Sequence, residues 1–104
     1  MGKARKQEDG PEAGGHFQPV RVDKPWGYEL IWARTADYVG KILHVNAGHA
    51  LSLQYHEVKD EVIHLLHGRM VLEAGPSADA LEKIPIAEGG SFHIRPGTVH
   101  RMTA

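Results

Sequence analysis

The chain is built from short alternating segments separated by glycine and proline turns, and this pattern restricts it to an all-β fold. Apolar and polar side chains alternate over residues 20–23, 28–32 and 38–46, as expected for strands that bury one face. No segment keeps the 3.6-residue repeat of an amphipathic helix. Short strands at nearly regular spacing favour a double-stranded β-helix, the jelly-roll type of barrel.

The length of 104 residues is enough for one hydrophobic core. Residues 1–15 are rich in charged residues and glycine and have no large apolar residue after Met1. Such a segment cannot bury enough surface to offset the entropy of ordering. We therefore predict a flexible tail over residues 1–15 and a single domain over residues 16–104.

The overall charge does not favour binding to nucleic acid or to an acidic membrane. A formal net charge of -1 and a pI near 6.7 give no electrostatic reason to expect nucleic acid or an acidic membrane surface. No apolar run approaches the roughly 20 residues that span a bilayer. The absence of cysteine rules out disulfides and thiolate ligands and fits a reducing cytoplasm, where we expect the protein to act.

Residues 48–68 contain three potential metal ligands close together in sequence. Gln54 and His56 are two residues apart, so in a strand they share one face. After a charged turn at residues 58–60, a second strand is expected to begin at Glu61. Antiparallel pairing of these two strands would carry the Glu61 carboxylate back toward His56.

A fourth ligand is predicted in a later strand. Pro96 and Gly97 indicate a turn, and His100 falls in the strand after it. Imidazole, amide and carboxylate groups suit one divalent metal ion, with zinc our first choice and manganese, nickel or iron(II) as alternatives. Without a thiolate, a closed structural zinc site is not expected.

These residues resemble the motifs of the cupins. The first cupin motif is similar to Gly48, Gln54, His56, Glu61 and Gly68 as they stand here, and the second resembles residues 90–100. A glutamine at the position of Gln54, where most metal cupins carry histidine, is typical of the cupin domain of type II mannose-6-phosphate isomerases. The segments 24–28, 51–54 and 97–101 also look like that subfamily.

The resemblance implies an aldose–ketose isomerase that acts on a sugar phosphate. A bound cation would polarise the carbonyl while a nearby base moves a proton between adjacent carbons. For the phosphate, the family match points to Arg101, followed by Lys59 and then Arg95. The base stays open among Glu57, His49 and Tyr28, which are near the site in sequence.

Cupins generally continue through at least one more strand after the second motif. We expect N-terminal strands, from this chain or from a partner, to complete the barrel, since an unpaired strand edge is a liability. The resulting expectation is a homodimer, and exchange of strands between the two copies is one way to complete the barrel.

The remaining histidines are interpreted as structural or surface residues, because a single histidine is weak evidence for a metal site. By strand parity His64 points away from Glu61, whereas His67 shares the Glu61 face near a turn. His49 is a reserve ligand. The others in this group are His16, His44 and His93.

Two other functions fit the same residues. An oxygen-using cupin dioxygenase needs an open position on iron(II), nickel or copper. A non-catalytic cupin would bind a sugar or another small ligand without turnover. One barrel supports many chemistries, so the fold alone does not decide among the three.

Overall fold

The computed structural model describes residues 14–104, and these form eight β-strands and no helix. The predicted tail lies outside the described residues except for Gly14 and Gly15, which are exposed and outside any strand. The strands are β1 (Val20–Lys24), β2 (Gly27–Arg34), β3 (Val39–Val45), β4 (Glu61–His64), β5 (Met70–Gly75), β6 (Glu82–Ile86), β7 (Ser91–Ile94) and β8 (Val99–Thr103). The all-β prediction is confirmed, and within residues 14–104 no helix is present that could cross a membrane.

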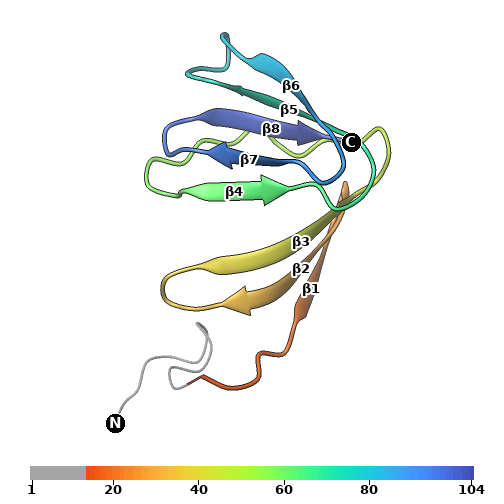
Figure 1. Ribbon diagram of the computed structural model, residues 1–104, viewed down its shortest axis with the longest axis vertical. Helices are drawn as coiled ribbons and strands as arrows, with labels where there is room; N and C mark the ends of the chain where they lie inside the picture. Colours follow the sequence, from red (N-terminus) through yellow and green to blue (C-terminus); the bar gives the residue numbers. More distant parts are fainter. Residues whose placement is uncertain (1–13) are drawn as a thin grey trace. The chain divides into compact units, whose positions relative to one another are not determined.

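Residue contacts divide the described part of the chain into two compact units, residues 14–44 and residues 45–104. The first unit holds the sheet β1-β2-β3 (Figure 1), except for Val45, the last residue of β3. The second holds the two-stranded sheet β4-β7 and the three-stranded sheet β6-β5-β8. The single domain over residues 16–104 stays a prediction.

The first sheet begins with a tight hairpin. The turn between β1 and β2 falls at Pro25 and Trp26, with Lys24 opposite Gly27. One face of this sheet contains the buried Ile31 and the carboxylate of Glu29, which is 13% exposed. Lys41 lies 3.1 Å from that carboxylate, so its charge is paired.

Aromatic side chains occupy the other face of the same sheet. Tyr28 stacks on His44 with ring centroids 5.0 Å apart, and the Arg21 guanidinium lies 3.9 Å from the centre of the Tyr28 ring. Trp32 lies over Gly40, where a Cβ atom would be only 2.7 Å from the indole ring. The absence of a side chain at Gly40 therefore allows Trp32 to lie close to β3.

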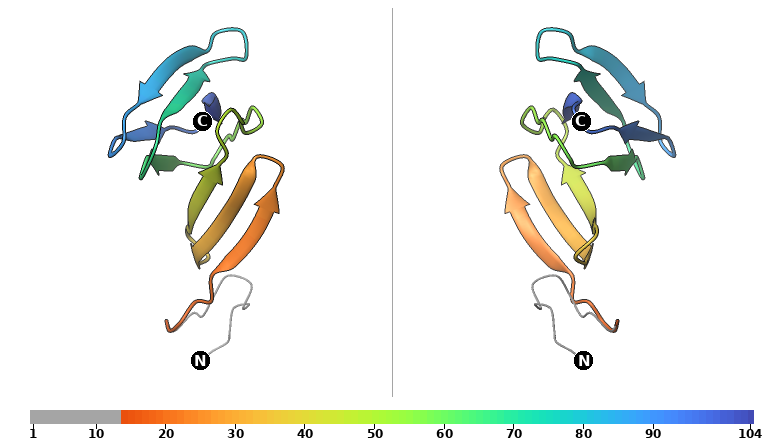
Figure 2. Two further views of the ribbon diagram at one scale, coloured as in Figure 1. Left: turned by 90° about the vertical axis from the view of Figure 1, so that its right-hand side faces the viewer. Right: turned by 90° about the vertical axis from the view of Figure 1, so that its left-hand side faces the viewer.

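The second unit has a small apolar core between its sheets. Strand β5 is central, pairing with β6 on one side and with β8 on the other, and both views in Figure 2 show β5 and β6 as a hairpin. Alternate residues of β5 and β8 point inward, which matches a strand with one buried face. The buried apolar side chains are Leu51, Leu72, Ala74, Ile86, Ile94 and Met102.

The pairing predicted for residues 48–68 is wrong. Residues 50–56 are extended but make only two isolated bridges, Ala50 with Thr103 and Gln54 with His100. They follow the free edge of β8 and do not pair with β4. Strand β4 begins at Glu61 as predicted, but its partner is β7, with Glu61 opposite Ile94. The backbone N–H and carbonyl of Gln54 are both bonded to His100 of β8.

Candidate metal centre

Gln54 and His100 come to the same place through a backbone bridge. The N–H of Gln54 donates to the carbonyl of His100 at 2.8 Å, and the N–H of His100 donates back at 2.9 Å. Directly opposed residues of an antiparallel pair project to the same face. His100, the ligand predicted in the last strand, therefore lies next to Gln54.

His56 is held against the turn that precedes β8. Its carbonyl accepts a hydrogen bond of 2.8 Å from the N–H of Gly97, whose φ of 85° lies in the left-handed region that glycine adopts readily. Gln54 and His56 are half-buried, whereas Leu53 and Tyr55 are 40% and 54% exposed. Gln54 and His56 therefore share one face, although residues 50–56 do not form a regular strand.

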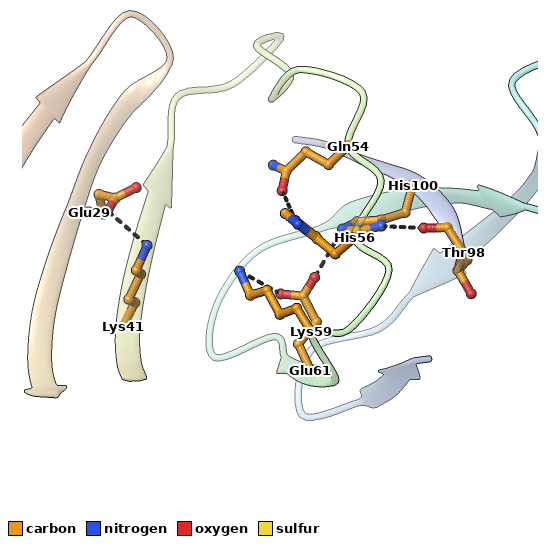
Figure 3. A network of polar contacts seen from close by, with 8 residues as sticks. All are labelled: Glu29, Lys41, Gln54, His56, Lys59, Glu61, Thr98 and His100. Atoms are coloured by element: carbon orange, nitrogen blue, oxygen red, sulfur yellow. Dashed lines mark hydrogen bonds and ion pairs between the residues drawn. The ribbon is translucent and has the colours of Figure 1, made fainter. Parts of the chain in front are cut away.

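Glu61 enters from the other sheet of the second unit. Strand β4 pairs with β7, and the turn at residues 95–98 connects β7 to β8. One ligand atom each from His56, Glu61 and His100 lie within 4.8 Å of one another, and Figure 3 shows these side chains gathered with Gln54. The structure therefore brings all four predicted ligands together.

The imidazole of His100 has a defined proton position. Its Nδ1 lies 3.0 Å from the backbone carbonyl of Thr98 (Figure 3). A carbonyl can only accept, so Nδ1 donates its proton, and in the neutral imidazole the lone pair is therefore on Nε2. In metal sites, the histidine ring nitrogen that does not bind the metal commonly donates a hydrogen bond to a backbone carbonyl, which fixes the orientation of the ring.

The lone pair of His100 faces another acceptor. Nε2 of His100 lies 3.0 Å from Oε1 of Glu61, yet the geometry is not that of a hydrogen bond, and both atoms are buried without a hydrogen-bond partner. His100 is only 2% exposed. With a neutral imidazole these are two buried acceptors that face each other, which is unfavourable unless a proton or a metal ion lies between them. These two atoms therefore fit a metal ion.

Gln54 and His56 are joined by a hydrogen bond. Nε2 of His56 lies 3.1 Å from Oε1 of Gln54, and the amide oxygen accepts. A cation coordinated by both atoms would take the place of the shared proton, because a metal-bound nitrogen must be unprotonated. Both side chains are already directed toward the same point, so little rearrangement is required.

Lys59 is the positively charged side chain beside these ligands. Its ammonium lies 3.6 Å from Oε2 of Glu61, and its side chain is 50% exposed (Figure 3). The two oxygens of Glu61 thus have different neighbours, His100 for Oε1 and Lys59 for Oε2. Of the three predicted catalytic residues, only Lys59 is brought to the metal ligands by a described contact.

Arg101 and Glu57 are placed differently. Arg101 follows His100 in β8 and projects to the opposite face, where Glu73 accepts from its Nε at 2.7 Å and lies 2.6 Å from Nη2. The structure therefore does not bring this guanidinium to His100. Glu57 is exposed, and its role as the base stays a prediction.

Most of the other histidines contact groups outside the site. His64 lies 2.7 Å from the Ser91 hydroxyl on the exposed face of β4 and β7, which confirms that it points away from Glu61. His93 pairs with Asp60 on that face at 2.6 Å. His67 is 93% exposed, and His49 is exposed with its Nδ1 3.3 Å from the carbonyl of Ala47.

The second unit also has a surface hollow of about 430 Å³ that is separate from the four ligands. Its apolar lining includes Ile84 and Phe92, and Glu82 and Arg95 are its charged residues. Thr98 borders it, so the turn between β7 and β8 lies beside the hollow. Arg95, the third choice for a phosphate contact, lines this hollow.

Sequence reasoning missed the role of Thr98. Thr98 orients His100 through its backbone carbonyl. Because every residue has a backbone carbonyl, the residue type at position 98 could not indicate this role. The only indication was position, because Thr98 lies two residues before His100 and directly after the Pro96–Gly97 turn.

Comparisons with known proteins returned no matching family model, no matching curated protein and no matching solved structure. The resemblance to the cupins therefore stays an interpretation of the motifs. The local geometry of the four ligands stands independently of that resemblance.

Proposed function

We propose that the chain binds one divalent metal ion through Gln54, His56, Glu61 and His100 and acts on a sugar phosphate as an aldose–ketose isomerase. The observation that supports metal binding most directly is the buried pair of facing acceptors, Nε2 of His100 and Oε1 of Glu61. The isomerase assignment comes from the sequence motifs, including Gln54.

The separation of those two atoms fits adjacent ligands of one ion. Ligand atoms about 2.1 Å from a metal and at right angles are about 3.0 Å apart, whereas tetrahedral ligands are about 3.4 Å apart. The observed 3.0 Å is close to the separation of adjacent ligands of a single ion. Zinc remains our first choice, with manganese, nickel or iron(II) as alternatives.

When bound, the ion would supply Lewis-acid stabilisation of charge that develops on the substrate carbonyl oxygen. The carbonyl of Thr98 selects the neutral tautomer of His100 that has its lone pair on Nε2, and Glu61 provides the one negative charge among the ligands. Lys59 offers an ammonium for the phosphate. The base stays open among the predicted residues, including Glu57.

The proposed fold and oligomeric state rest on the same resemblance to the cupins. We propose a cupin barrel for the chain and a homodimer, with strand exchange as one way to form it. The described pairing gives β4 and β7 only each other as partners, so each has an edge that another strand can occupy. Cytoplasmic location belongs to this proposal and rests on the cysteine-free sequence.

One observation favours a second function. Two histidines and one carboxylate, as in His56, His100 and Glu61, form the donor set used by non-haem iron(II) oxygenases. A metal-dependent dioxygenase is therefore the second proposal.

The deciding experiment measures metal content and turnover together. Protein loaded with zinc, manganese, nickel or iron(II) is incubated with mannose 6-phosphate, and fructose 6-phosphate is measured. We expect conversion that is lost in Gln54→Ala and in His100→Ala and retained in His64→Ala, whose side chain lies on the outer face. Metal binding without conversion at any loading would remove the isomerase. Oxygen uptake by the iron(II) form would then favour the dioxygenase, and ligand binding indifferent to metal would favour a non-catalytic binder.

A further inference from the structure

We infer that Lys59 couples the bound metal ion to an anionic substrate group, so that metal and anion each strengthen the binding of the other. This inference rests on the proposed metal site. It assigns to Lys59 a function other than that of a simple ion-pair partner of Glu61.

The charge of the ligand set supports an anionic substrate. Gln54 and the two imidazoles are neutral as ligands, and Glu61 contributes a single negative charge. A divalent ion bound by these groups therefore keeps one positive charge, and the Lys59 ammonium raises the local excess to two. Because uncompensated charges in a partly buried site are costly, such a site favours a ligand with two negative charges, such as a phosphomonoester.

The position of Lys59 indicates how the two binding events are linked. Its ammonium lies 3.6 Å from Oε2 of Glu61, on the opposite side of the carboxylate from the buried Oε1. A metal ion that takes Glu61 competes with Lys59 for the same negative charge. The ammonium, on a side chain that is half-exposed, is then available to an anion that arrives from solvent.

The simpler interpretation is that Lys59 only orients Glu61. The two interpretations predict opposite effects on metal affinity. If Lys59 orients Glu61, its removal weakens metal binding. If Lys59 competes with the metal, its removal relieves repulsion between like charges and strengthens metal binding, by about tenfold for charges a few ångströms apart at a protein surface.

The test titrates wild type, Lys59→Met, Lys59→Arg and Lys83→Met with Zn²⁺ and with Mn²⁺ by calorimetry, with and without sulfate at constant ionic strength. Sulfate is a dianion that serves as the probe, and titrations of metal into sulfate alone correct for direct association. Lys83 is an exposed lysine of β6 and controls for the change in net charge.

We expect Lys59→Met to bind metal severalfold to about tenfold more tightly than wild type without sulfate. Sulfate should strengthen metal binding to wild type and to Lys59→Arg by about tenfold, and metal should strengthen sulfate binding by the same factor. This coupling should be largely lost in Lys59→Met and unchanged in Lys83→Met.

Weaker metal binding by Lys59→Met, or the same response to sulfate as wild type, would overturn the inference and leave the metal site intact. Failure of wild type to bind any divalent ion would overturn both the inference and the proposed function.

Discussion

His100 connects the features that define the candidate metal centre. Its backbone pairs with Gln54, its Nδ1 donates to Thr98, and its Nε2 faces Glu61. At 2% exposure it is the most deeply buried of the four proposed ligands. A buried imidazole whose lone pair has no donor is unfavourable as a purely structural group, and this favours metal binding.

At the residue scale, replacing Glu61 with glutamine should abolish tight metal binding. The substitution preserves the shape of the side chain and removes the only negative charge among the ligands. We expect a loss of about 100-fold or more in affinity, since even substitutions outside the ligands cost 10- to 100-fold. Calorimetric titration with Zn²⁺ measures this loss.

The matched control is Glu73→Gln, which removes a carboxylate from the opposite face of the sheet β6-β5-β8. It should bind Zn²⁺ with wild-type affinity. Equal losses in the two variants would indicate a general charge effect and contradict a site built on Glu61.

At the element scale, Arg101 and Glu73 stabilise the pairing of β5 with β8. Their contacts of 2.6 and 2.7 Å connect residues that are directly opposite each other, and the Glu73 side chain is only 15% exposed. Arg101→Gln should lower the free energy of unfolding by about 1 kcal/mol, because it leaves the carboxylate without its partner. Chemical denaturation measures the change.

The same variant should leave metal affinity unchanged, since Arg101 projects to the opposite face of β8 from His100. A large loss of metal binding in a folded Arg101→Gln protein would contradict this placement. Loss of turnover with metal affinity intact would instead support the predicted phosphate contact.

The packing of β2 on β3 gives a second prediction at this scale. In Gly40→Ala the new methyl group would lie 2.7 Å from the Trp32 ring, so the indole must move. Because Trp32 is 53% exposed, the indole can move toward solvent, and we expect a loss of about 1 kcal/mol in the free energy of unfolding, the order of an off-rotamer side chain. A double-mutant cycle with Trp32→Leu tests the cause. If Gly40→Ala costs as much without the indole as with it, the steric explanation is wrong.

At the scale of the whole molecule, metal binding should stabilise the second unit. A ligand at 100 times its Kd that binds only the folded state adds about 2.7 kcal/mol. The ion would connect residues from the 50–56 segment, β4 and β8. Hydrogen exchange should therefore slow at Gln54 and His100 when Zn²⁺ is added and should return to its original rate with a chelator.

The first unit provides the control for that measurement. Strands β1 and β2 contain no proposed ligand, so the exchange rates of their amides should not change. Equal protection from exchange in both units would indicate a global effect. It would contradict local binding of the metal ion at the four proposed ligands.

The sequence by itself located several of the strands. Alternation and turn residues located β1, β2, β3 and the strand that contains His100, because one buried face and tight turns leave direct marks on residue type. The segment 50–56, which was expected to be a strand, forms only two isolated bridges. The same parity placed Gln54 and His56 on one face and directed His64 away from Glu61. Motif spacing also selected the four proposed ligands before their positions were known.

The tertiary structure decided which strands pair and which groups contact the proposed ligands and the charged side chains. Pairing of β4 with β7, and of residues 50–54 with β8, depends on contacts between distant segments, and alternation does not encode partners. Likewise only the folded chain shows that Glu73 holds Arg101, that Lys59 neighbours Glu61 and that the Thr98 carbonyl orients His100. Side-chain type records local burial and turn geometry, whereas the neighbours of a charge or a lone pair depend on how the sheets are assembled.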